Sequence, residues 1–219
     1  MTLAAAGLAV AALPASAAST DVLRYSGTET SGTLAIDRSG SGNSGTLHNV
    51  QLTGSGYAFN GQSSYISVPA SASLNPGTAN FSYGVTMSLP AGYTFTHDLS
   101  LVRRGASKLS GAYYKLELVY KKSTGNTHLE CAMRDSAGKT GYVSVGAAGL
   151  NDGAWHTLTC SKTGSTVSLT KNGNVYAKAA SLGSFSTTRA LNFGAEQVTD
   201  TSFWEHYIGK MKDIFQTRG

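Results

Sequence analysis

Hydrophobic and polar residues alternate along most of the chain after residue 20. Apolar side chains recur at every second position in short runs rich in valine, leucine, tyrosine and threonine. The clearest runs are DVLRY (21–25), YISV (65–68), YKLELVY (114–120), HLECAMR (128–134), TGYVSV (140–145), HTLTC (156–160) and TVSLTK (166–171). This period of two predicts antiparallel strands, and we expect no long helix in this region.

Glycine, asparagine, serine and aspartate separate these runs. Asn172-Gly173 stands between TVSLTK and NVYAKA, and this dipeptide is a strong signal for a two-residue hairpin turn. A second hairpin is expected at Asn60-Gly61, between AFN and YISV. Many short strands at this spacing predict an all-β sandwich or barrel. No linker divides residues 21–219, so we expect one domain there.

The first 20 residues, MTLAAAGLAVAALPASAAST, have a different pattern. An apolar run from Leu3 to Leu13 precedes a small-x-small sequence that ends at Ala17, which predicts a secretory signal peptide cleaved near Ala17/Ala18. The basic residues that usually precede the apolar run are missing. The alternative is a short core helix. No later segment is apolar enough for a membrane span, so we expect a secreted, extracellular protein.

Cys131 and Cys160 are the two cysteines of the chain, and each lies in an alternating run. In an exported protein such a pair predicts a disulfide, formed across adjacent strands. The alternative is two unlinked buried thiols. Without a nearby histidine cluster, the pair does not predict a zinc site.

Charged residues make up 13% of the chain, about half of the share usual for soluble domains, and the net charge is +5. The basic residues are scattered and no nucleic-acid-binding motif accompanies them, so we expect no nucleic-acid partner.

Five segments in order carry a resemblance that covers nearly all of residues 21–217. They are AIDRSGSGNSGTLHNV, YAFNGQSSYISVPASASLNPGTANFSYGVTMSL, LNDGAWHTLTCSKTGSTVSLTKNGNVYA, LNFGAE and YIGKMKDIFQT. Together they resemble the laminin G-like domain of the concanavalin A-like lectin/glucanase superfamily. The resemblance implies a jelly-roll sandwich of two curved antiparallel sheets, in agreement with the strand pattern.

The resemblance also implies one structural Ca²⁺. Its ligands would be the carboxylate of Asp213 in the last strand and the main-chain carbonyls of Gly61 and Arg24. The sequence departs from the family at Asn60 and Lys212, where acids are more usual, and both changes lower the negative charge near this site.

Glucanases of this superfamily use paired carboxylates on alternate positions of one strand. None of the twelve acids in this chain has that spacing on a strand, although a pair assembled from different strands stays open. The segment GSGNSG matches a dinucleotide-binding pattern, but a strand-like segment follows it where a helix is needed.

The predicted function is therefore a secreted, non-catalytic recognition module that binds a glycan or a cell-surface component, as a monomer. The alternatives are a glycoside hydrolase of the same fold and a protein-binding adhesive domain. Aromatic side chains stack on sugars. Trp204 and Tyr207 are the predicted ligand-binding residues, and Tyr113, Tyr114 and Tyr120 are further candidates, although any of them could be a core residue.

Overall fold

The computed structural model describes residues 18–106, 110–197 and 202–219, and it confirms the predicted all-β jelly-roll sandwich. The first sheet has the order β14 (Asn174–Ala179), β13 (Thr166–Lys171), β12 (His156–Thr163), β7 (Phe81–Ser88), β18 (Ile208–Arg218), β5 (Tyr57–Asn60) and β4 (Gln51–Leu52), and β1 (Thr20–Tyr25) also pairs with β18. The second sheet has the order β11 (Thr140–Gly146), β10 (Asn126–Arg134), β9 (Tyr113–Lys121), β8 (Leu99–Arg104), β15 (Leu191–Phe193), β6 (Tyr65–Val68), β3 (Gly45–His48) and β2 (Leu34–Ala35). A short ladder joins β16 (Glu196–Gln197) to β17 (Phe203–Trp204).

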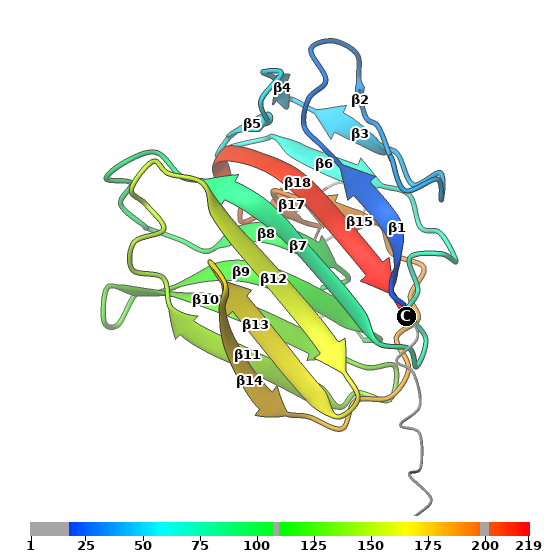
Figure 1. Ribbon diagram of the computed structural model, residues 1–219. Coiled ribbons are helices and arrows are strands. Elements are labelled where there is room, and N and C mark those ends of the chain that lie inside the picture. Colours follow the sequence, from blue (N-terminus) through cyan, green and yellow to red (C-terminus); the bar gives the residue numbers. More distant parts are fainter. Residues whose placement is uncertain (1–17, 107–109, 198–201) are drawn as a thin grey trace, which may run out of the picture.

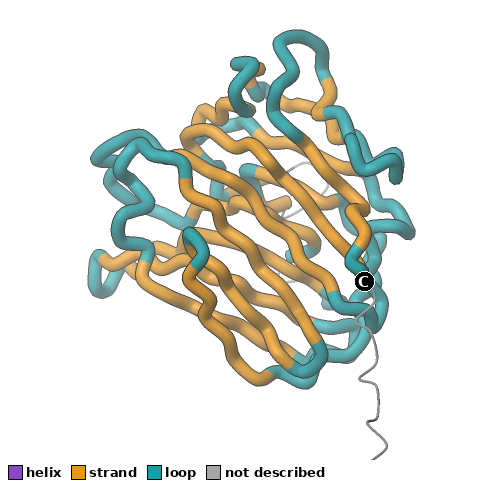
Figure 2. The backbone as a smooth tube through the Cα atoms, in the orientation of Figure 1, coloured by secondary structure: helices purple, strands orange, loops and turns teal. Residues whose placement is uncertain are grey.

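The two sheets form two layers, with β7, β12 and β13 in front of β8, β9 and β10 in Figure 1. Figure 2 shows strands joined by loops, with no helix in the described part of the chain. The alternation predicted from the sequence sets which side chains face the core. In β9, Leu116 and Leu118 are fully buried in the core, whereas Lys115 and Glu117 point to the opposite face of the sheet, away from the first sheet.

The disulfide between Cys131 and Cys160 is present, with a Cα–Cα distance of 5.6 Å. The sequence predicted that the bond would join adjacent strands, but its two strands belong to different sheets. Cys131 is in β10 of the second sheet and Cys160 is in β12 of the first. Both side chains face the core, so the bond joins the two layers across the sandwich.

The two predicted turns have different outcomes. Asn172 and Gly173 have φ angles of 49° and 83° and connect β13 to β14, as a two-residue hairpin turn requires. The turn at Asn60-Gly61 is not a hairpin, because β5 belongs to the first sheet and β6 to the second. The side-chain oxygen of Asn60 accepts hydrogen bonds from the amides of Gln62 and Ser63, and this loop carries the chain from one layer to the other.

Residues 194–197 and 202–207 lie along the edge of β8 and bring acidic residues to the second sheet. The amide of Gly194 donates to the carbonyl of Leu101 over 3.2 Å, and the amide of Ser100 donates to the carbonyl of Glu205 over 2.8 Å. The described residues of this segment therefore continue the sheet beside β8, on the side where β15 ends.

The predicted signal peptide falls mostly on residues 1–17, which lie outside the described residues, and it stays a prediction. Strand β1 begins at Thr20. Within the described residues there is no helix of the length and apolarity that a bilayer span requires.

Candidate functional site

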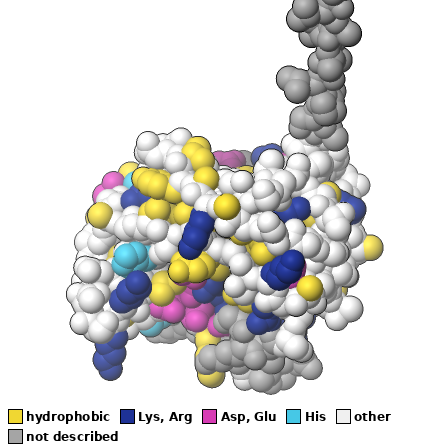
Figure 3. Space-filling view, turned by 90° about the horizontal axis from the view of Figure 1, so that it is seen from below, with side chains coloured by type: hydrophobic (Ala, Val, Ile, Leu, Met, Phe, Trp, Pro, Cys, Tyr) yellow, Lys and Arg dark blue, Asp and Glu magenta, His cyan; other side chains and the backbone are white. Residues whose placement is uncertain are grey.

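A cluster of charged residues lies on the outer face of the second sheet, the face directed away from the first sheet. Arg103 of β8 is opposite Lys115 of β9, and Glu117 of β9 is opposite Glu130 of β10. Directly opposed residues of an antiparallel pair place their side chains on the same face. Figure 3 shows acidic side chains gathered in the middle of one face of the molecule, with basic and apolar side chains beside them.

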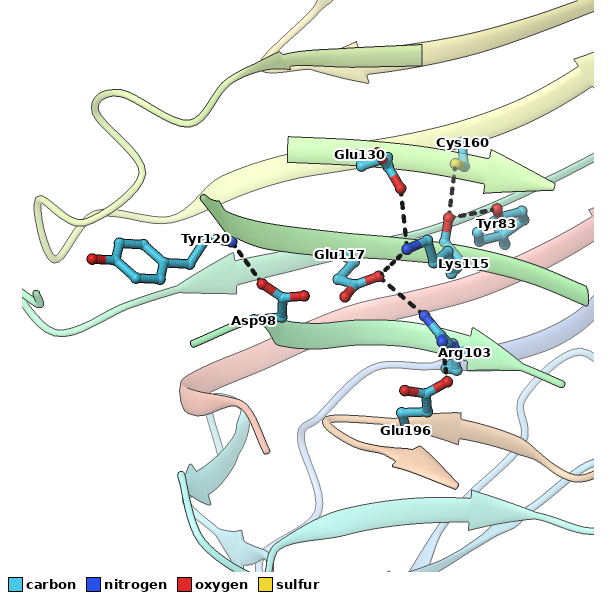
Figure 4. Close-up of polar contacts among 9 residues, drawn as sticks. All are labelled: Tyr83, Asp98, Arg103, Lys115, Glu117, Tyr120, Glu130, Cys160 and Glu196. Carbon is cyan, nitrogen blue, oxygen red and sulfur yellow. Dashed lines mark hydrogen bonds and ion pairs between the residues drawn. The ribbon is translucent and has the colours of Figure 1, made fainter. Parts of the chain in front are cut away.

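Ion pairs connect these side chains, as Figure 4 shows. Glu117 uses a single oxygen, Oε2, to bind Arg103 Nη1 at 3.0 Å and Lys115 Nζ at 2.5 Å. Lys115 also binds Glu130 at 3.1 Å, and Arg103 also binds Glu196. Glu117 and Arg103 are 1% and 2% exposed, so these pairs are shielded from water and each partner depends on the other.

Two further carboxyl groups approach Glu117 from its other side. Asp98 precedes β8, and its Oδ1 accepts a hydrogen bond of 2.7 Å from the amide of Tyr120. Glu205 is held beside β8 by the bond to the Ser100 amide, and its backbone has a φ of 55°, which is uncommon for a residue other than glycine. One carboxylate oxygen from each of Asp98, Glu117 and Glu205 lies within 4.8 Å of the other two.

The closeness of these carboxyl groups and their burial raise the pKa values of two of them. Burial, followed by the negative charges of Glu117 and Glu196, raises the pKa of Glu205 to about 9, although Arg103 acts in the opposite direction. Burial also raises the pKa of Asp98, with a further contribution from Glu117. Glu205 therefore holds a proton at neutral pH, because no cation neutralises it directly among the described residues.

Ser100 Oγ and Glu205 Oε2 are buried in the cluster without a hydrogen-bond partner in the described part of the chain. Ser100 is fully buried and lies opposite Glu117 in the pairing of β8 with β9, so its hydroxyl lies on the same face as the carboxylates. An unpartnered buried hydroxyl is costly, and such an atom calls for a specific explanation.

A shallow hollow of about 210 Å³ lies next to the cluster on the same face. Its lining is formed by Tyr113, Lys115, Glu130, Ala132, Thr140, Gly141 and Tyr142. Tyr142 is 50% exposed. Arg134 stacks over the ring of Tyr113 at 4.7 Å, and Lys178 lies 4.6 Å from the centre of the Tyr142 ring. The hollow thus combines two aromatic rings with a paired lysine and glutamate.

Aromatic side chains also lie on the other flank of the cluster. His48 stacks on Tyr65 at 4.3 Å, and Tyr65 stacks on Phe203 at 4.0 Å. Trp204 follows Phe203 in β17 and is 53% exposed. Since β16 supplies Glu196 to the cluster, this short ladder carries the tryptophan to the same side of the second sheet.

The predicted ligand-binding residues have different positions. Trp204 is exposed in the short strand β17, not in a loop. Tyr207 is fully buried against Phe59, and its hydroxyl donates to the carbonyl of Ser88 over 2.9 Å, so it is a core residue that a sugar cannot reach. Tyr114, a further candidate, is also buried, whereas Tyr113 lines the hollow.

The predicted calcium ligands are brought together only in part, since Arg24 pairs with Phe215, two residues from Asp213. Asp213 lies in a bulge of β18, with a φ of 47°. Gly61 follows Asn60, which pairs with Ile208, and a strand rises ~3.3 Å per residue, so Gly61 lies several residues along β18 from Asp213. The carbonyl of Arg24 already accepts a hydrogen bond of 2.9 Å from the amide of Arg38. Gly61 is therefore apart from the other two residues, and the calcium site that the resemblance implies stays a prediction.

The acids of the cluster come from different strands and loops. A pair of carboxylates assembled in this way was an open alternative in the sequence, which does not show the residues that form it. The visible signal is that Glu117 and Glu130 stand at outward positions of alternating runs. Their pairing with each other, and with Asp98, Glu196 and Glu205, depends on strand register and chain crossing, which the sequence pattern does not contain.

Comparisons with known proteins concern the fold. No protein-family description matches the sequence, and no curated protein matches it. The receptor-binding domain of botulinum neurotoxin mosaic serotype C/D, with tetraethylene glycol bound on its Hcn sub-domain, is similar in structure, with a TM-score of 0.66, 14% identity and coverage of 90% of this chain and 47% of that chain. The binding domain of botulinum neurotoxin DC in complex with SialylT has a TM-score of 0.66, 13% identity and coverage of 90% and 47%.

The same kind of domain in complex with rat synaptotagmin II has a TM-score of 0.64, 12% identity and coverage of 90% and 48%. This chain spans about half the length of these structures. At such identities the likeness shows a shared fold.

Proposed function

We propose that this protein is an exported, non-catalytic recognition module of laminin G-like architecture, which binds a carbohydrate or another cell-surface component on the outer face of its second sheet. The observation that carries the proposal is the hollow between Tyr113 and Tyr142. It lies on a face that none of the described residues covers at this point, next to a network of fixed charges.

The chemistry of the hollow suits a sugar. Sugar rings have apolar faces that stack on aromatic side chains, and hydroxyls that need donors and acceptors at fixed positions. Tyr113 and Tyr142 supply the rings. Lys115 and Glu130 supply a donor and an acceptor whose positions are fixed by their ion pair. Trp204 is a further aromatic surface on the other flank.

The structural neighbours support a binding role. They are described as binding or receptor-binding domains, one in complex with SialylT and another with rat synaptotagmin II. These partners belong to those proteins. For this chain they favour a module that recognises a glycan or a protein at a cell surface.

Burial of the carboxylates argues against the hydrolase alternative. Glu117 is 1% exposed, and one of its oxygens already binds two cations. A nucleophile or general base must reach the substrate, and a general acid works best with a pKa near the working pH, below the value of about 9 at Glu205.

A glycan array probed with the purified protein tests the proposal. We expect binding that falls about tenfold or more in Tyr142→Ala and in Tyr113→Ala, because each loses a stacking surface. Tyr176→Ala is the matched control, since Tyr176 is 40% exposed on β14 of the other sheet. Equal losses in all three variants, or release of reducing ends from the bound glycan, would contradict the proposal.

Export is tested separately. In a secreting host, the protein recovered from the medium should begin near Ala18 by intact mass and elute as a monomer in gel filtration. Retention of the first residues in the exported protein would contradict cleavage at this site.

A further inference from the structure

We propose that the oxygens of Asp98, Glu117 and Glu205, together with the hydroxyl of Ser100, bind a divalent cation, and that this cation is Ca²⁺. The proposal goes beyond glycan recognition and does not depend on it. It places the cation at residues that sequence reasoning did not bring together, on the outer face of the second sheet and far from the predicted ligands of the resemblance.

The distances fit a calcium ion. Ca²⁺ binds oxygen ligands at ~2.3–2.6 Å, so two ligands on opposite sides of the ion are ~5 Å apart. One oxygen from each of the three carboxylates lies within 4.8 Å of the others. The set contains only oxygen donors, with no cysteine or histidine, and such a set favours hard cations over transition metals.

The ion pairs and the backbone hydrogen bond use only the outer oxygens, so the inner oxygens of Asp98, Glu117 and Glu205 face one another, and without a metal they share protons in hydrogen bonds to Glu117. Glu117 binds Arg103 and Lys115 through Oε2, which leaves Oε1 for the side where Asp98 and Glu205 lie. Asp98 binds the Tyr120 amide through Oδ1, which turns its other oxygen toward Glu117 in Figure 4. The cationic partners thus hold the carboxylates in place from outside the site.

The charge count shows a deficit of positive charge. Among the described residues, the cluster has five acids, Asp98, Glu117, Glu130, Glu196 and Glu205, and two bases, Arg103 and Lys115, which is a formal charge of −3 when every carboxyl group is ionised. Largely buried carboxylates without a cation are costly, and they must take up either protons or a metal. One divalent ion that displaces the proton of Glu205 would reduce this formal charge to −1. It would bind Asp98 and Glu205, which have no ion pair in the described part of the chain, and the second oxygen of Glu117.

Ser100 provides an independent indication of a ligand. Its side chain is fully buried, its Oγ has no hydrogen-bond partner in the described part of the chain, and its register opposite Glu117 directs it into the cluster. Asp98 lies two residues earlier, on the same side by the alternation of the strand. A hydroxyl oxygen here completes a fourth protein ligand, and water can supply the rest of the six to eight oxygens that Ca²⁺ takes.

The first experiment is calcium titration of the purified, metal-free protein at pH 7.5, by isothermal calorimetry and by thermal melting in CaCl₂ and in EGTA. We expect one site per chain and a melting temperature at least about 3 °C higher in 1 mM Ca²⁺, because a ligand bound only by the folded state stabilises it. MgCl₂ at the same concentration should give a smaller shift, since Mg²⁺ requires a tighter octahedral site.

Asp98→Asn and Glu205→Gln should each weaken calcium binding at least about tenfold while the protein stays folded, because each removes one charged ligand without changing its shape. Asp213→Asn is the matched control. It removes an acid of the same kind at the position that the family resemblance implies, and it should leave the titration unchanged. Circular dichroism of each variant confirms that the fold is retained.

The proposal is overturned by any of three results. The first is a wild-type protein with no calorimetric signal and no melting difference between Ca²⁺ and EGTA. The second is an unchanged affinity in Asp98→Asn and Glu205→Gln. The third is a calcium response that disappears in Asp213→Asn. If shared protons alone compensate the cluster, Glu205→Gln will melt higher than wild type in both buffers, and wild type will not respond to calcium.

Discussion

The outer faces of the two sheets have the same strand pattern but different chemistry. On the first sheet, the outward positions of β7, β12 and β13 are mainly serine and threonine. Some of these hydroxyls pair across strands, as Ser82 does with Thr217 at 2.6 Å and Thr86 with Thr157 at 3.3 Å. On the second sheet, the same outward positions hold Arg103, Lys115 and Glu117.

The two faces differ in whether their side chains need a protein partner at a fixed position. A hydroxyl on an open face can exchange its partner for water at little cost, so the first face needs no fixed arrangement. Glu117 and Arg103 are almost fully buried, because residues 194–197 and 202–207 lie beside them, and each needs its partner at a set position. Hydroxyls therefore make a tolerant surface, and shielded charges make an ordered site.

The largest expected loss of stability on either outer face follows substitution of Arg103. Arg103→Met leaves Glu117 and Glu196 without their shared partner, and removal of one member of a buried ion pair costs ~3–5 kcal/mol. Ser161→Ala, at an outward position of β12 in the first sheet, should change stability by less than ~0.5 kcal/mol. Urea unfolding of both variants measures the difference. Similar losses would show that the two faces do not differ in this way.

The disulfide links the two layers, so its removal should weaken the support of both faces at once. The cysteines are 29 residues apart, and closing a loop of this size stabilises by ~3–4 kcal/mol in the chain-entropy model. Cys131→Ala/Cys160→Ala should lower the unfolding free energy by that amount. The measurement is urea unfolding in the absence of reductant, with the reduced wild type for comparison. A loss below ~1 kcal/mol would contradict the role of the bond as a link between layers.

The stability of the protein should depend on pH through Glu205, a residue of the charged cluster on the second sheet. Its carboxyl has a raised pKa of about 9 against an ordinary value of 4.5, so the folded protein keeps a proton that the unfolded chain releases. The stabilisation is complete below the ordinary pKa and is lost as the pH rises toward 9. Among the described residues, the charged groups that face it are Glu117, Glu196, Arg103 and Asp98.

In EGTA we therefore expect the melting temperature of wild type to fall between pH 5 and pH 9. Glu205→Gln should flatten this dependence and, at pH 8.5, melt ~2–4 °C higher than wild type, which corresponds to ~1 kcal/mol in a domain of this size. Thermal melts in EGTA across this range provide the measurement. A slope that persists in Glu205→Gln would assign the pH dependence to another group.

The smallest loss of stability is expected for a substitution of Lys212, a charged residue of β18 in the first sheet. Lys212 lies 4.7 Å from the centre of the Trp155 ring, on a partly exposed surface, and a cation–π contact of this kind is worth ~0.5–1 kcal/mol. Lys212→Met should cost at most that amount, as measured by urea unfolding. A loss comparable with that of Arg103→Met would remove the distinction between the faces.

Local sequence rules predicted much of the scaffold. Alternation in YKLELVY predicted which leucines are buried, and Asn172-Gly173 predicted a hairpin turn, because both depend on the conformation of neighbouring residues. His156 shares the inward face of HTLTC with Leu158 and Cys160, and its ring lies between Asp152 and Asn172 with both nitrogens hydrogen-bonded. The same rules were wrong about Tyr207, because a polar neighbourhood in the sequence does not show that a ring is buried in space.

The sequence by itself therefore determined the strands, the turn at Asn172-Gly173 and the pairing of the two cysteines. Each follows from side-chain periodicity, from backbone geometry over a few residues, or from the presence of a single possible partner. Tertiary structure alone decided that β5 and β6 belong to different sheets, and that Asp98, Glu117 and Glu205 meet. These residues are distant in the chain, and their proximity depends on cross-strand register and on the return of residues 202–207 to the edge of β8, which no local pattern encodes.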